Sequence, residues 1–177
     1  EMVLYPHAQG LPELRQLVAD KLDSERNIKV GIDQVIITPG SGQAIALFTE
    51  LFTNPGDTII TEEFTYSNAL NVMRRFGANI VGVPLDQEGI RPDALDAIIQ
   101  DLVKHGNRPK FIYTIPTFQN PTGADMGTKR RHEILTVAQK HRVPIYEDDC
   151  YMDLRFEGDP APAMFAADDS EMVLYSG

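Results

Sequence analysis

Short apolar runs alternate with segments of helical periodicity along almost the whole chain. The runs are rich in Ile, Val and Thr, and they predict buried strands at residues 34–38, 58–61, 79–84, 110–114, 144–147 and 172–175. Between them, apolar residues recur at helical spacing and predict helices at residues 11–23, 43–53, 66–76, 92–103 and 128–141. This alternation predicts an α/β fold of three layers, in which helices flank both faces of a mostly parallel sheet.

The composition narrows the class of protein. The 177 residues are enough to bury the core of one domain, and no apolar run has the length of a membrane span. The net charge is -10 without a sustained basic run, which argues against nucleic-acid binding by this segment. Cys150 is the single cysteine, so a disulfide framework is excluded and a reducing, cytoplasmic location is favoured.

Three acidic residues, Glu147, Asp148 and Asp149, stand where the strand at 144–147 should end. Ligands of open α/β sheets bind at the carboxyl ends of strands. Strand alternation places Asp148 on one side and its two neighbours on the other. A single inward carboxylate is suited to holding a positive charge, such as a protonated ring nitrogen, and Tyr151 can converge with it if the chain turns. The alternative is a solvated acidic loop. No metal is expected, because the four histidines are scattered without ligand spacing.

The run Pro39-Gly40-Ser41-Gly42 joins a predicted strand to a predicted helix. Glycines allow the backbone to approach a ligand closely, and a helix start offers free N–H groups and a positive dipole end. Ser41 can donate to a phosphate oxygen. The run matches neither the Walker nor the dinucleotide pattern. A Ser-capped helix after a tight turn is the alternative.

Two further loops follow predicted strands. Asn120 lies between two prolines, and its amide can donate and accept hydrogen bonds at once. Tyr66 opens a helix after the strand at 58–61, where an aromatic ring can lie over a flat ligand. The alternatives are an ordinary Asn-Pro turn and an aromatic residue that packs at a helix start.

Taken in order, these motifs resemble those of the fold-type I aminotransferases of class I/II, in particular the 2-aminoadipate and kynurenine aminotransferase group. The resemblance runs from Tyr5 to Gly177. It rests on the runs Gly10-Leu11-Pro12-Glu13-Leu14-Arg15, Pro39-Gly40-Ser41-Gly42-Gln43, Asn120-Pro121-Thr122-Gly123 and Glu147-Asp148-Asp149-Cys150-Tyr151, with Tyr5 and Tyr66. It implies a pyridoxal 5'-phosphate enzyme that moves an amino group from an amino acid to a 2-oxo acid and works as a homodimer.

The resemblance assigns catalytic roles to Asp148 and Tyr151. Asp148 matches the carboxylate that pairs with the pyridinium nitrogen of the cofactor and keeps the ring protonated. Tyr151 and Asn120 match the groups that hydrogen-bond the phenolic oxygen of the ring. Asn120 also resembles a contact to the substrate carboxylate.

Further cofactor contacts are implied in the same way. Tyr66 matches the aromatic residue that stacks on the ring, and Ser41 and Gly42 match the phosphate cup. Tyr5 matches a tyrosine that reaches the phosphate of the neighbouring subunit.

The chain departs from the family pattern at two points. Cys150 stands where relatives commonly have Pro. The Schiff-base lysine is expected shortly after Gly177, and the arginine that binds the substrate carboxylate is expected in a small domain that the chain lacks. Residues 1–177 are therefore expected to be part of a large, cofactor-binding domain, without an N-terminal segment and the small domain, and inactive by themselves.

Two alternatives use the same scaffold. One is the effector domain of a GntR/MocR-type transcription regulator, in which a winged helix precedes an aminotransferase-like domain. The other is a lyase that acts at the β-carbon, since a fold does not determine the reaction.

Overall fold

A five-stranded parallel sheet forms the centre of the computed structural model, which describes residues 7–177. The strand order is β2-β1-β5-β6-β7, and every neighbouring pair is parallel. The strands are β1 (Thr58–Glu62), β2 (Asn79–Val83), β5 (Ile112–Thr114), β6 (Ile145–Asp148) and β7 (Val173–Ser176). Because all five run the same way, their carboxyl ends meet at one edge of the sheet.

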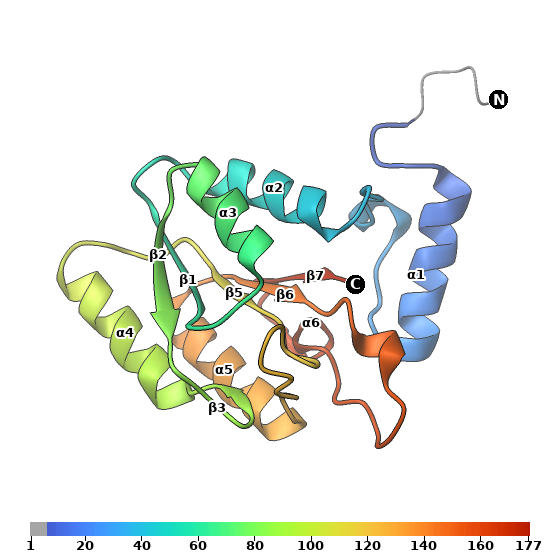
Figure 1. Cartoon of the computed structure of the whole chain (residues 1–177). Coiled ribbons are helices and arrows are strands. Elements are labelled where there is room, and N and C mark those ends of the chain that lie inside the picture. Colours follow the sequence, from blue (N-terminus) through green and yellow to red (C-terminus); the bar gives the residue numbers. More distant parts are fainter. Residues whose placement is uncertain (1–6) are drawn as a thin grey trace.

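Helices cover both faces of the sheet, as Figure 1 shows. Helices α2 (Ser41–Phe52) and α3 (Ser67–Arg75) lie on one face, and α4 (Pro92–Lys104), α5 (Thr128–His141) and the short α6 (Met164–Ala167) lie on the other. Helix α1 (Pro12–Arg26) stands to one side, beside the 3-10 turn η2 (Met152–Leu154). The three-layer α/β architecture expected from the alternating pattern is confirmed.

Strand alternation divides the core into two clusters. Ile60, Ile112 and Ile145 are fully buried in the cluster beneath α4, α5 and α6. Their sequence neighbours Ile59 and Tyr146 belong to the cluster beneath α2 and α3. Side chains thus leave each central strand alternately toward both helical layers, which explains why every residue of these strands is buried.

The predicted strand at residues 34–38 is wrong. A 3-10 turn, η1 (Ile32–Gln34), precedes an extended segment that pairs with no strand of the described chain. Ile37 packs on Gly10, where a Cβ atom would lie only 2.8 Å from the Ile37 side chain. The Ile37 amide donates to the Gln9 carbonyl. Ile36 is 57% exposed. The apolar run therefore packs on the loop before α1 instead of entering the sheet.

Two small elements were not expected from the sequence. Strands β3 (Leu85–Asp86) and β4 (Gly89–Ile90) form an antiparallel hairpin with its turn at residues 87–88. Helix α6 lies in a segment without helical periodicity. None of the helices in residues 7–177 combines the length and apolar character that crossing a membrane requires.

Candidate active site

The acidic run at the end of β6 is buried. Glu147, Asp148 and Asp149 are at most 2% exposed, so the solvated-loop alternative is wrong. Asp148 points toward Tyr113, and Glu147 points to the opposite side, where it meets the start of α6. The strand therefore separates the two carboxylates as alternation predicts.

The two carboxylate oxygens of Asp148 differ in their hydrogen bonding. The Tyr113 hydroxyl donates to Oδ2 over 2.7 Å, whereas no hydrogen bond of good geometry reaches Oδ1 from the part of the chain that the structure describes. Burial raises the pKa of Asp148 above its ordinary value, and the hydrogen bonding of Tyr113 opposes that shift. An unpaired buried carboxylate oxygen is costly unless a donor or a cation satisfies it. The arrangement can thus accept a protonated nitrogen at Oδ1.

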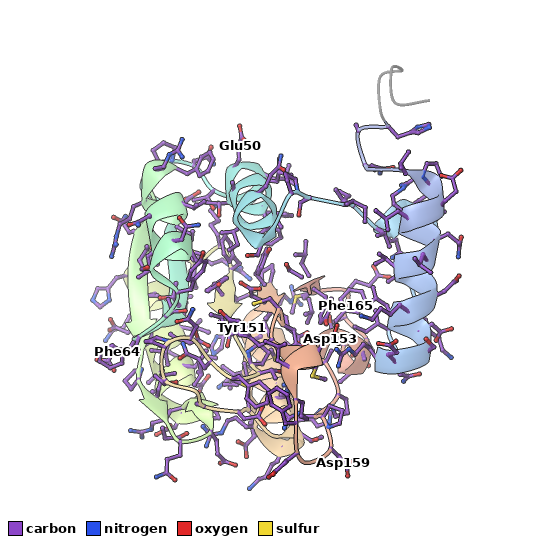
Figure 2. The ribbon with its side chains drawn as sticks, turned by 45° about the vertical axis from the view of Figure 1, so that its right-hand side comes forward. Glu50, Phe64, Tyr151, Asp153, Asp159 and Phe165 are labelled. Carbon is purple, nitrogen blue, oxygen red and sulfur yellow. The ribbon has the colours of Figure 1, made fainter. Side chains whose placement is uncertain are left out.

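Asn120 and Tyr151 converge although 31 residues separate them. The chain turns after Asp149 and leads into η2, as the sequence suggested. The Asn120 amide donates to the Tyr151 hydroxyl over 3.2 Å. Figure 2 shows Tyr151 near the middle of the view, and its side chain is half-buried. Both residues line a shallow, open depression of about 300 Å³, together with Phe118, Gln119, Pro121, Gly123 and Leu154.

The predicted phosphate cradle forms the start of α2. Gly40 has a φ of 89°, which favours glycine, and it is the residue that caps the helix. Ser41 is the first helical residue, and its side chain makes no capping hydrogen bond, so the Ser-cap alternative is wrong. A Cβ atom on Gly42 would lie 3.4 Å from the Asn68 amide nitrogen in the first turn of α3. The starts of α2 and α3 are therefore neighbours.

Tyr66 caps the start of α3 and is half-buried. Its ring packs in part against the core cluster beneath α2 and α3, as the packing alternative expected. Within residues 7–177, no hydrogen bond joins Ser41, Gly42 or Tyr66 to the Asp148 and Asn120 groups. The two halves of the site are thus brought to one edge of the sheet without a hydrogen bond between them in the described chain, and Tyr5 lies outside the described residues.

Comparison with known proteins decides the family. A family model described as "Aminotransferase class I and II" matches residues 1–177. The chain belongs to this family.

Three relatives illustrate the range of this aminotransferase family. Aromatic-amino-acid aminotransferase 1 of Thermococcus litoralis is 38% identical over 98% of the chain and 42% of its own length. The solved kynurenine aminotransferase of Pyrococcus horikoshii, in complex with PMP, superimposes with a TM-score of 0.92 at 33% identity and covers 98% of this chain and 43% of that one. An uncharacterized HTH-type transcriptional regulator of Bacillus subtilis, YisV, is 34% identical over 98% of the chain and 34% of its own length. The chain thus spans less than half the length of these proteins.

The chain contains a buried acid that the sequence analysis missed. Glu62, the last residue of β1, is 1% exposed and accepts four hydrogen bonds. The donors are the Thr65 hydroxyl, the Thr114 hydroxyl, the Ile115 amide and the Gln119 side-chain amide, at 2.7, 2.7, 2.8 and 2.9 Å. Burial raises its pKa to about 7, and these donors oppose the shift.

A second buried network lies on the same face of the sheet, at the end of β6. The Arg131 guanidinium, from α5, donates to the Met126 carbonyl at 2.8 Å, to the Thr117 hydroxyl at 2.8 Å and to Glu147 Oε1 at 3.3 Å. Glu147 also accepts the backbone amides of Met164 and Phe165 at the start of α6. Burial raises the pKa of Glu147 to about 7, and the backbone amides and Arg131 oppose the shift. In the part of the chain that the structure describes, no group of three or more His, Cys, Asp or Glu side chains could hold a metal ion.

Proposed function

We propose that the chain is part of the large, cofactor-binding domain of a pyridoxal-phosphate-dependent aminotransferase. The longer protein would transfer an amino group from an amino acid to a 2-oxo acid. The family match supports this proposal, and the single structural observation that carries it is Asp148, a buried carboxylate with one oxygen left unpaired by residues 7–177. Bound pyridoxal phosphate would supply an electron sink for the α-carbon of the substrate.

The donor set at this sheet edge fits the proposed cofactor. Asp148 Oδ1 would accept a hydrogen bond from the protonated ring nitrogen, while Tyr113 holds the other carboxylate oxygen in place. A carboxylate kept ionised by that cation favours the protonated ring, because the two charges stabilise each other in a buried place. Asn120 and Tyr151, already joined to each other, would both hydrogen-bond the phenolic oxygen, and Asn120 would also meet the substrate carboxylate.

The start of α2 would hold the phosphate. Ser41 and Gly42 offer a free hydroxyl and the first backbone N–H groups of a helix whose dipole favours an anion. Tyr66, at the adjacent start of α3, would cover one face of the ring. The catalytic lysine would follow Gly177 in the longer protein.

The remaining proposals concern the whole protein. We propose a homodimer, in which Tyr5 reaches the phosphate in the neighbouring subunit, and a cytoplasmic location, which the single cysteine favours.

The test is amino-group transfer and cofactor binding by the full-length protein and its Asp148→Asn variant. The neutral amide cannot stabilise the protonated ring, so we expect turnover at saturating cofactor to fall about a hundredfold or more. Asp149→Asn is the matched control, because the side chain of this buried acid points to the opposite side from Asp148. Turnover of Asp148→Asn close to the wild-type rate would refute the role of Asp148. Substrate breakdown without a new amino acid would instead favour a lyase.

A second candidate is an effector-sensing domain, which the 34% identity to a transcription regulator favours. In that case the full-length protein would bind duplex DNA with an affinity that falls steeply with salt, and it would bind pyridoxal phosphate without sustained turnover. Sustained transfer with no DNA binding would exclude this candidate.

A further inference from the structure

We infer that Glu62 and Gln119 are positioning residues. Through one buried network they hold the loop that carries Asn120 and the loop that carries Tyr66 at a fixed spacing around the cofactor. The inference rests on the proposed function.

Glu62 is placed where three segments of the site meet. Its donor Thr65 immediately precedes Tyr66 in the loop after β1. Its donors Thr114 and Ile115 form the carboxyl end of β5, from which the Asn120 loop departs. All four hydrogen bonds are 2.9 Å or shorter and involve a carboxylate that is 1% exposed. A buried donor left without its acceptor is costly, so this single group, which accepts from four donors, fixes the three segments relative to one another.

Gln119 extends the link to its neighbour Asn120. Its amide nitrogen donates to Glu62 at 2.9 Å and to the Phe64 carbonyl at 2.7 Å. Its amide oxygen accepts from the backbone and the hydroxyl of Thr122 at 2.9 and 2.7 Å. Both ends of the side chain are thus engaged, and the residue is 2% exposed. Gln119 therefore ties both sides of the Asn120 turn to the end of β1.

An amide cannot replace the carboxylate in this place. In Glu62→Gln, the carbonyl oxygen of the new amide must accept the hydrogen bond from the Ile115 N–H. Its NH₂ group then faces the NH₂ group of Gln119, and neither can accept. Rotation of the Gln119 amide would relieve that conflict only by breaking its bonds to Phe64 and Thr122. The substitution conserves volume but should release the Asn120 loop.

The experiment uses the full-length protein, with pyridoxal phosphate as the probe. Glu62→Gln and Gln119→Leu are compared with Glu147→Gln, a control that replaces another buried strand-end carboxylate on the same face of the sheet; Glu147 bonds Arg131 and the start of α6 instead of Gln119. We expect the Kd for pyridoxal phosphate to rise about tenfold in the first two variants and less than twofold in the control. In the cofactor-free protein, hydrogen exchange of the Ile115 and Thr122 amides should speed up in Glu62→Gln and stay unchanged in Glu147→Gln.

Two results would overturn the inference. One is an equal change in Kd for Glu62→Gln and Glu147→Gln at comparable loss of thermal stability, which would mean that Glu62 only stabilises the fold. The other is unchanged exchange at Ile115 and Thr122. Should the wild-type protein bind no pyridoxal phosphate, the proposed function fails, and the exchange comparison still decides whether Glu62 holds the loops.

Discussion

Replacing Arg131 with Met tests how strongly the buried ion pair holds α5 to the end of β6. The Arg131 and Glu147 side chains are 3% and 0% exposed, so removal of the cation leaves a carboxylate without its charge partner. Breaking a buried pair from one side typically costs about 3–5 kcal/mol. Glu147 keeps two backbone amide donors, which places the expected loss near the lower limit, at about 3 kcal/mol.

The assay is urea unfolding of the full-length protein, read as a double-mutant cycle at pH 8. The double variant Arg131→Met/Glu147→Gln removes both charges and should recover part of the loss, because a neutral pair leaves no buried charge uncompensated. Arg131 opposes the raised pKa of Glu147, so the loss for Arg131→Met should be smaller at pH 5, where the carboxyl is mostly protonated. A loss below about 1 kcal/mol at pH 8 would refute the reasoning.

Two further predictions concern single side chains. Replacing Tyr66 with Phe should hardly change the affinity for pyridoxal phosphate and replacing it with Ala should weaken it, because the ring face supplies the contact; equal binding by both variants would reduce Tyr66 to a packing residue. Burial raises the pKa of Glu62 from 4.5 to about 7. Between these pH values the folded protein retains a proton that the unfolded chain releases. The stability contributed by this group is therefore fully present below pH 4.5 and is lost as the pH rises toward 7. Relative to wild type, Glu62→Gln should therefore gain up to about 3 kcal/mol of unfolding free energy between pH 4.5 and 7, and a difference that is flat with pH would contradict this.

The sequence was informative where a role depends on local position. Asp148 could be found because the end of an apolar run and strand alternation fix its place and direction. Tyr151 required only the expected turn after Asp149. The segment at residues 34–38 misled the analysis, since its apolar pattern does not reveal that Ile37 packs on Gly10 instead of entering the sheet.

The buried networks could not be found in this way. Gln119 meets Glu62 across 57 positions and Arg131 meets Glu147 across 16, so no local pattern announces either pair. The sequence shows Glu62 as an acid at the end of a predicted strand, directly followed by Glu63. Burial alone distinguishes the two, and burial follows from how the sheet and the loops pack.

The four donors that share the Glu62 carboxylate also constrain how this protein can diverge. Thr65 lies in the loop after β1, whereas Thr114 and Gln119 lie at the end of β5 and in the loop that follows it. Each donates to the same carboxylate, so a change at one position alters which hydrogen bonds the others must supply. Related sequences should therefore exchange these positions as a correlated set. In a chimera that takes the Asn120 loop from a relative without the matching partners at Thr65 and Thr114, the Glu62 carboxylate would lack some of its hydrogen-bond donors.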